Sequence, residues 1–258
     1  MTPPGNDEFA ERTVLEAALD LFVRKGFANT RLDEIAQTAG VTRRQLTYHY
    51  RDKTSLYRET LRYGLRLLHI PAEQLRSTAD VPVEAMREVI GRVFDAFFSS
   101  PNSVRLITAE NLHPILPPGE SGDLVEQHPA VQEYDRILLL GRDLGAFRTD
   151  VSALDIHFIC ASMCCFPTLG DPAFHGIYSM PLTAEALRDR TRALVTDTII
   201  GFLTSSSGGS GDTSYTGIEL PAEKTKVQIK LADEVYGEDD TQVVADEVAP
   251  DFTDIYQD

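Results

Sequence analysis

The chain has few cysteines, no apolar run as long as a membrane span and no pattern of a secretory signal at its start. Its three cysteines lie within six residues of one another, whereas small secreted folds rely on dispersed disulfides. A bilayer helix needs about 20 predominantly apolar residues in succession. Residues 1–13 have neither a basic nor an apolar region. We therefore expect a cytoplasmic protein with reduced thiols and no membrane partner.

Patterns that carry catalysis or metal binding are also missing. The sequence has no glycine-rich phosphate loop and no motif with a carboxylate pair. Four histidines show no metal-ligand spacing: His69, His113, His128 and His175. The cluster of Cys160, Cys164 and Cys165, with His157 nearby, leaves open a thiol sensor or soft-metal site, although buried cysteines more often pack as small hydrophobic residues. We expect no enzyme, no cofactor and no metal.

Charge is distributed unevenly along a chain whose net charge is -16. Residues 1–66 carry a net charge of +2, residues 67–204 carry -8, and residues 205–258 carry -10. Within the first segment, residues 43–53 hold four cationic side chains against Asp52 alone. A local positive patch of this kind favours an anionic partner such as nucleic acid, even though the whole chain is acidic.

The first 204 residues predict one helix after another and no strand, so we expect an all-α fold. The apolar periodicity predicts a helix over 8–25 that ends at Gly26, a second between Thr30 as its cap and Gly40, and a third that begins after Thr42. The later helices are expected over 53–76, 83–99, 101–113, 129–145, 152–166 and 183–204. Proline and glycine predict breaks at 114–128 and 167–181.

Residues 205–258 have the composition of a flexible linker followed by an acidic tail. Val227, Ile229 and Leu231 alternate with polar residues as in a strand, but one strand is not stable alone. The tail could compete with DNA for the basic patch, recruit a basic partner, or act only as a solvating extension.

The third helix begins with complete capping chemistry and has two different faces. Thr42 and Gln45 form a capping box, flanked by Val41 and Leu46 as a hydrophobic staple. With Leu46 facing inward, Tyr50 falls on the same side, and the opposite side carries Arg44, Gln45, Thr47, Tyr48 and Arg51. Arginine can bind guanine bidentately and glutamine can bind adenine, so this face has the chemistry of base recognition in a major groove. The free N–H groups at the starts of the second and fourth helices can hold phosphates near Thr30 and Lys53.

Residues 13–61 resemble the DNA-binding domain of TetR-family transcriptional regulators, notably in the segments Gly26-Phe27, Ala39-Gly40-Val41 and His49-Tyr50. The resemblance implies an N-terminal three-helix helix-turn-helix domain at 1–62 and a larger ligand-binding and dimerisation domain at 63–204. The acidic tail at 205–258, expected from composition, is longer than the family pattern requires. The family usually has an aromatic residue where this chain has Thr47. His49 either contacts DNA directly or bridges core and surface through one hydrogen bond. The expected groove contacts are Arg43, Arg44, Gln45, Thr47, Tyr48 and His49, and the expected phosphate contacts are Thr30, Lys53 and Tyr57.

For the larger domain, the resemblance implies a small-molecule pocket and a homodimer interface in the last two helices. Pocket candidates are Phe97, Phe98, Asn111, His113, Tyr134 and Phe158, and interface candidates are Leu187, Leu194, Val195 and Phe202. The predicted function is a sequence-specific regulator, a homodimeric repressor that releases its double-stranded DNA operator when a small-molecule effector binds. The alternative is a non-catalytic helical interaction protein that docks basic partners through its acidic tail.

Overall fold

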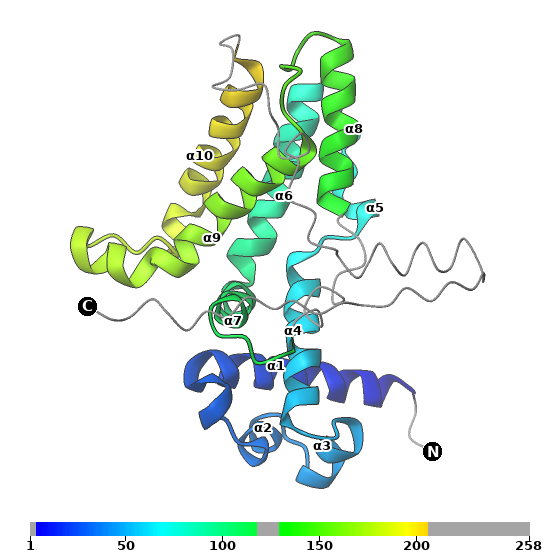
Figure 1. Cartoon of the computed structure of the whole chain (residues 1–258), viewed down its shortest axis with the longest axis vertical. Helices are drawn as coiled ribbons and strands as arrows, with labels where there is room; N and C mark the ends of the chain where they lie inside the picture. Colours follow the sequence, from blue (N-terminus) through cyan, green and yellow to red (C-terminus); the bar gives the residue numbers. More distant parts are fainter. Residues whose placement is uncertain (1–3, 118–128, 206–258) are drawn as a thin grey trace, which may run out of the picture. The chain divides into compact units, whose positions relative to one another are not determined.

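The computed structural model describes residues 4–117 and 129–205, which belong to one compact unit; side chains are described from residue 11 onward. These ranges are helical and contain no strand, which confirms the predicted all-α fold (Figure 1). The acidic tail and the predicted strand at Val227–Leu231 lie outside the described residues. The helices are α1 (Pro4–Asn29), α2 (Leu32–Thr38), α3 (Arg43–His49), α4 (Lys53–Leu68), α5 (Ala72–Leu75), α6 (Pro82–Ser99), α7 (Pro101–Leu112), α8 (Pro129–Asp143), α9 (Ala153–Tyr178) and α10 (Glu185–Thr204).

Two glycines separate the first three helices. The backbone of α1 leaves the helical conformation at Gly26, where φ is 74° and ψ is 165°. Gly40 has a φ of 69° in the turn between α2 and α3. L side chains rarely adopt such positive φ values, so glycine is the residue that allows the chain to reverse within so few residues.

Lys53, the first residue of α4, closes the broken end of α1. Its Nζ donates to the carbonyl oxygens of Phe27 (2.8 Å), Ala28 (3.3 Å) and Thr30 (3.2 Å). The same nitrogen lies 4.4 Å from the centre of the Phe27 ring. The last carbonyls of a helix have no partner within it, and an ammonium group has three N–H donors. Lys53 therefore directs all its donors into the protein.

Thr30 does not cap α2, contrary to the prediction. Arg31 occupies the N-cap position and makes no side-chain cap. The Thr30 side chain is buried, and its hydroxyl donates to the carbonyl oxygens of Gly26 (2.8 Å) and Leu21 (3.2 Å). Because the backbone of α1 leaves the helical conformation at Gly26 and carbonyl oxygens near this break lack helical partners, the hydroxyl turns inward to satisfy them.

Two other helices differ from their predicted bounds. The helix expected over 53–76 is divided into α4 and α5 around His69 and Pro71, because proline lacks an N–H and disfavours a helical conformation in the residue before it. By contrast, α9 continues to Tyr178 through Pro167 and Pro172, where a break was expected. Each proline removes one backbone hydrogen bond, but Pro167 and Thr168 are buried, and packing holds the helix together.

Two hydrophobic cores hold these helices. The first, here called the head core, packs α1, α2, α3 and the first half of α4 against α7; its buried residues include Leu15, Ala18, Phe22, Ile35, Leu46, Leu56, Leu61 and Leu106. The second, here called the body core, packs α6, α8, α9 and α10; its buried residues include Met86, Ile90, Phe94, Tyr134, Ile137, Ile156, Cys160, Ile199 and Leu203. Helix α4 contacts α1, α6 and α7, so it belongs to both assemblies.

A buried carboxylate joins α4 to the end of α7. Glu110 is 4% exposed and accepts hydrogen bonds from the Tyr57 hydroxyl (3.0 Å) and from the backbone N–H groups of Ile115 (3.0 Å) and Leu116 (2.9 Å). Burial, followed by the neighbouring charge of Glu110, raises the pKa of Tyr57. Buried charges are tolerated when hydrogen bonds surround them, so this cluster fixes α4 and α7 relative to each other.

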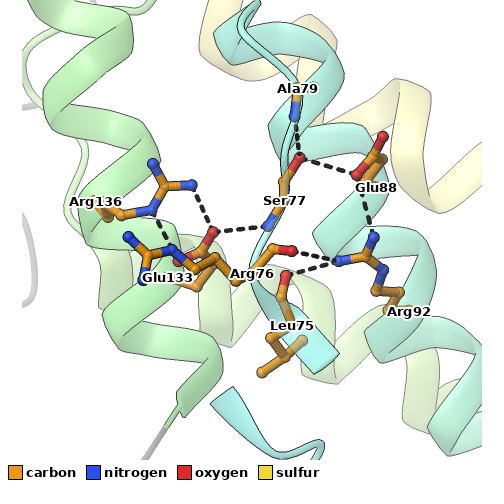
Figure 2. A network of polar contacts seen from close by, with 8 residues as sticks. All are labelled: Leu75, Arg76, Ser77, Ala79, Glu88, Arg92, Glu133 and Arg136. Atoms are coloured by element: carbon orange, nitrogen blue, oxygen red, sulfur yellow. Dashed lines mark hydrogen bonds and ion pairs between the residues drawn. The ribbon is translucent and has the colours of Figure 1, made fainter. Parts of the chain in front are cut away.

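A polar network fixes the link between α5 and α6 (Figure 2). The backbone N–H of Ser77 donates to Glu133 of α8 (3.1 Å), and its hydroxyl donates to Glu88 of α6 (2.9 Å). Arg92 donates to the carbonyl oxygens of Leu75 (2.8 Å) and Arg76 (3.2 Å). The link is therefore tied to two helices of the body core.

Helix α9 is long and apolar enough to cross a bilayer, judged by its length and mean hydropathy alone. No segment of this kind was expected from the sequence. A core helix of a soluble protein passes the same test. In this chain α9 packs against α6, α7, α8 and α10, which accounts for part of its apolar composition, while Leu154, Phe158, Phe166 and Leu169 remain exposed.

We expect Tyr57→Phe to lower the free energy of unfolding by about 1–2 kcal/mol, because Glu110 loses one of its three donors inside the protein. Urea denaturation at one fixed protein concentration measures the change. Tyr48→Phe is the matched control, because the Tyr48 side chain is exposed. Equal midpoints for the Tyr57 variant, the Tyr48 variant and the unmodified protein would contradict this account of Glu110.

We expect Lys53→Met to lower the free energy of unfolding by roughly 1–2 kcal/mol, because the carbonyl oxygens at the end of α1 lose a charged donor while the apolar stem is kept. The control is Arg51→Met, which removes the same charge from an exposed side chain that has no hydrogen bond or ion pair among the described residues. The same denaturation assay separates them: a Lys53 variant as stable as the Arg51 variant would refute the closing role of Lys53.

Candidate nucleic-acid interface

Helix α3 is held against the protein by one buried residue within it and one that follows it. Leu46 is 1% exposed and Tyr50 is buried, and both belong to the head core. Burial raises the pKa of Tyr50 to about 12, so its phenol stays neutral. The inward direction predicted for both side chains is therefore confirmed, and the opposite side of α3 faces outward.

Capping boxes fix the start of α3 and the start of α4. Thr42 donates its backbone N–H to the Gln45 side chain (2.8 Å), and the Gln45 backbone N–H donates to the Thr42 hydroxyl (3.2 Å). Asp52 and Ser55 make the same reciprocal pair, with distances of 2.7 and 3.0 Å. Hydrogen bonds from Ser55 lower the pKa of Asp52, which keeps the cap charged. The capping box predicted for Thr42 is confirmed.

The outward face of α3 is basic, aromatic and exposed. Tyr48 is 85% exposed, and its ring meets the His49 ring edge to face at 5.2 Å. Arg43 makes an exposed ion pair with Asp33 of α2 (3.2 Å), and Arg44 makes no side-chain hydrogen bond or ion pair among the described residues. Exposed ion pairs are weak, so both guanidinium groups can turn to a ligand. All six predicted groove residues are exposed: Arg43, Arg44, Gln45, Thr47, Tyr48 and His49.

Two of these six side chains have part of their hydrogen-bonding capacity occupied. The carbonyl oxygen of the Gln45 side chain accepts from Thr42, which leaves its amide hydrogens as donors. The Thr47 hydroxyl donates to the carbonyl oxygens of Arg43 (2.9 Å) and Arg44 (3.2 Å), which leaves its methyl group and oxygen lone pairs facing outward. The face therefore presents mainly donors, which suit phosphate oxygens and the acceptor atoms of guanine.

The three predicted phosphate contacts are corrected by the structure. Thr30 and Tyr57 are buried, and their hydroxyls donate to carbonyl oxygens of α1 and to Glu110, respectively. Lys53 directs its ammonium group to the end of α1. Each is thus engaged in holding the head core together. A helix that breaks at a glycine leaves carbonyl oxygens without helical partners. The break predicted at Gly26 was therefore the one feature of the sequence that could have indicated an internal hydrogen-bonding role for Lys53.

Two exposed arginines beside α3 were not assigned a contact from the sequence. Arg51 follows α3 directly, and Arg31 precedes α2. The helical projection placed Arg51 on the outward side of the third helix without assigning it a contact, and its side chain is exposed as expected. These arginines are better placed than Lys53 to meet a phosphate backbone.

A cavity of about 430 Å³ lies between α4, α6, α7 and α9. Of the six predicted pocket residues, Phe97 and Asn111 line it. Tyr134 is buried in the body core, Phe98 packs against that core, and His113 and Phe158 are exposed, so these four do not line it. The lining residues are Leu65, Leu68, His69, Ile70, Leu75, Val93, Phe97, Val104, Ile107, Thr108, Asn111, Pro129, Ala130, His157, Ala161 and Cys165.

The predicted dimer surface is only partly available. Val195 is buried in the body core, and Phe202 packs beneath Arg148, whose guanidinium carbon lies 4.8 Å from the ring centre. Leu187 is half-buried, whereas Leu194 is 56% exposed. Val195 thus belongs to the chain's own interior. Helix α9 adds exposed apolar side chains that the sequence analysis had not placed on this surface: Leu154, Phe158, Phe166 and Leu169.

The cysteines are free thiols with different surroundings. Cys160 and Cys164 are buried with their Sγ atoms 4.0 Å apart, and Cys165 is half-buried at the cavity wall. Burial raises the pKa of Cys165, which disfavours a reactive thiolate. Among the described residues, no group of three or more potential ligand side chains is placed to hold a metal ion.

Comparisons with known proteins agree with this geometry. Residues 14–60 match the family described as bacterial regulatory proteins, tetR family, and residues 82–199 match a tetracyclin repressor-like C-terminal domain. The HTH-type transcriptional repressor NicS of Pseudomonas putida is 28% identical over 161 residues, which are 61% of this chain and 76% of NicS. The HTH-type transcriptional regulator RutR of Escherichia coli K12 is 34% identical over 116 residues, 44% of this chain and about half (54%) of RutR.

A solved structure shows the same fold. The structure of AibR in complex with isovaleryl coenzyme A and operator DNA has a TM-score of 0.52 and 19% sequence identity, and it covers 76% of this chain and 98% of AibR. The two family matches together include the outward-facing α3 and three of the helices that surround the cavity, α6, α7 and α9. The chain belongs to the TetR family of bacterial transcriptional regulators.

Proposed function

We propose that this chain is a sequence-specific repressor that binds its operator as a homodimer and releases it when a small molecule enters the cavity. The observation that carries the proposal is the exposed basic and aromatic face of α3, held outward by the buried Leu46. Family membership supports the binding of double-stranded DNA, because relatives of this chain are transcriptional regulators and AibR was solved with operator DNA.

In this function, α3 enters the major groove and its side chains contact base edges. Arg44 binds a guanine through its two parallel N–H donors, and Tyr48 packs on a thymine methyl group or donates to a phosphate. Arg43, Gln45, Thr47 and His49 complete the groove contacts. Arg51 and Arg31 meet the backbone and set the register of the helix. Thr30, Lys53 and Tyr57 support the head core from within.

Residues 1–62 would serve as the reading domain and residues 63–204 as the dimerising, effector-binding domain. One seven-residue helix reads only a few base pairs, so a dimer that reads two half-sites is needed for specificity. Exposed apolar side chains of α9 and α10, such as Phe158 and Leu194, offer the surface on which two copies pair.

The position of the cavity beside α4 provides a route by which a bound ligand releases the DNA. Leu65 and Leu68 of α4 line it, and the other end of α4 carries Tyr57 and Lys53, which contact α7 and the end of α1. A ligand that favours another position of α4 would change the spacing of the two reading helices. A preference of a few kcal/mol for the released state is sufficient to shift the population.

The proposal assigns no catalytic activity to the chain and places its action in the cytoplasm, where the DNA lies. The buried thiols support this assignment, because an enzyme that used them would need an accessible thiolate. Cys160 and Cys164 instead act as small apolar residues of the body core.

We expect Arg44→Ala to weaken operator binding by about 1–3 kcal/mol, the value of a bidentate base contact, and to reduce discrimination between operator and unrelated DNA. Fluorescence anisotropy with the DNA upstream of the chain's own coding region measures both affinities. The matched control is Arg66→Ala, which removes one exposed arginine from the last turn of α4.

The two variants separate base reading from general electrostatics. Arg66→Ala is expected to keep the ratio of specific to non-specific affinity, and Arg44→Ala to lower it. If both variants keep the ratio, α3 does not read bases through Arg44. If the unmodified protein binds no promoter fragment in dilute buffer, the regulator function itself is wrong.

A further inference from the structure

We propose that the cavity between α4, α6, α7 and α9 takes an uncharged, mainly apolar molecule that carries a hydrogen-bonding group such as an amide or a hydroxyl. This inference rests on the proposed function, since the molecule would be the effector that releases DNA. It adds the chemical class of that effector.

The described part of the cavity wall has few ionisable groups. Among the described lining residues none is Asp, Glu, Lys or Arg, and the titratable side chains are those of His69, His157 and Cys165. Moving an ion from water into an apolar site without an opposite charge costs several kcal/mol, which a few dispersion contacts do not offset. Carboxylates and phosphates are therefore disfavoured in this cavity, whereas a neutral molecule loses little on entry.

Two polar groups of the wall lie next to each other on α7. Thr108 and Asn111 are three residues apart, so they lie on one side of the helix, and both line the cavity. Neither side chain makes a hydrogen bond with another described residue. The amide of Asn111 offers both donors and an acceptor, and the hydroxyl of Thr108 offers one donor and two lone pairs. An amide or hydroxyl on the ligand finds complementary partners there.

A histidine at the wall is held by its own helix. The Nδ1 atom of His69 lies 3.1 Å from the carbonyl oxygen of Leu65. A carbonyl oxygen only accepts, so Nδ1 carries a hydrogen and donates it to Leu65. This ring nitrogen is therefore already engaged and does not serve as a partner for a ligand.

Size limits the molecule further. A volume of about 430 Å³ is near the lower end of ligand-binding pockets. One or two rings with a single polar substituent match this volume.

A second hollow provides the contrast. It is lined by Ala72, Glu73, Arg76, Gln132, Glu133 and Arg136 with Pro129, so charges of both signs surround it. Arg136 is already paired with Glu133 at 2.6 Å, and Figure 2 shows this pair beside Arg76. An anionic ligand would have to displace that carboxylate. The two hollows differ enough in chemistry for one pair of probes to tell them apart.

The probes are 2-naphthamide and 2-naphthoate, which have the same shape and differ in charge. Titration calorimetry with the full chain measures binding without DNA. We expect 2-naphthamide to bind at least tenfold more tightly than 2-naphthoate. Equal or tighter binding of the naphthoate overturns the proposal, and so does the absence of saturable 2-naphthamide binding.

Two matched substitutions locate the binding site. Asn111→Leu removes an amide from the wall of the apolar cavity, and Gln132→Leu removes an amide from the second hollow. Both side chains are exposed enough for the variants to fold, which circular dichroism checks. We expect Asn111→Leu to weaken 2-naphthamide binding at least fivefold and Gln132→Leu to leave it unchanged. The reverse pattern, or no effect of Asn111→Leu, contradicts the proposal.

Measuring DNA affinity in the presence of the probe distinguishes a failure of the ligand class proposed here from a failure of the proposed repressor function. Operator affinity is measured by anisotropy with and without saturating 2-naphthamide. If calorimetry shows the expected preference but DNA affinity is unchanged, the chemistry of the cavity stands and the release function fails. If DNA binding is normal and calorimetry shows no preference for the neutral probe, the regulator stands and the assigned ligand class fails.

Discussion

The burial of Leu46 is the contact on which the reading surface depends. Helix α3 has seven residues, and a helix this short does not persist in water without tertiary support. Leu46 and Tyr50 supply that support from the inner side, and the capping box of Thr42 and Gln45 fixes where the helix begins. With the inner side fixed, the direction of Arg44 and Tyr48 follows from helical geometry alone.

Helix α4 connects this surface to the rest of the protein. Its first residue closes the end of α1, its middle meets Glu110 of α7, and its last turns line the cavity. The side chains that join α4 to its neighbours are buried or hydrogen-bonded, so a displacement at one end cannot be absorbed by loose packing in between. A single helix thus contacts both the cavity and the residues that support α3.

The sequence predicted best what depends on neighbouring residues. The capping box of Thr42, the end of α1 at Gly26 and the outward face of α3 are local features, and each was predicted correctly. Thr30, Lys53 and Tyr57 were misplaced because their partners lie 4 to 53 residues away, and periodicity carries no information on such pairs. The prolines of α9 and the inward position of Val195 likewise depend on packing between helices. Four of the six predicted pocket residues lie outside the wall of the described cavity, and their positions depend on the same packing between helices.

The central claim, that the exposed face of α3 lies against DNA bases, is tested most directly by site-specific crosslinking. A photo-reactive phenylalanine analogue replaces Tyr48 in one protein and the exposed Leu139 of α8 in another, and each is irradiated with radiolabelled operator. The account predicts crosslinks from position 48 to bases within each half-site and none from position 139. Equal crosslinking from both positions, or none from position 48 to bound operator, would contradict it.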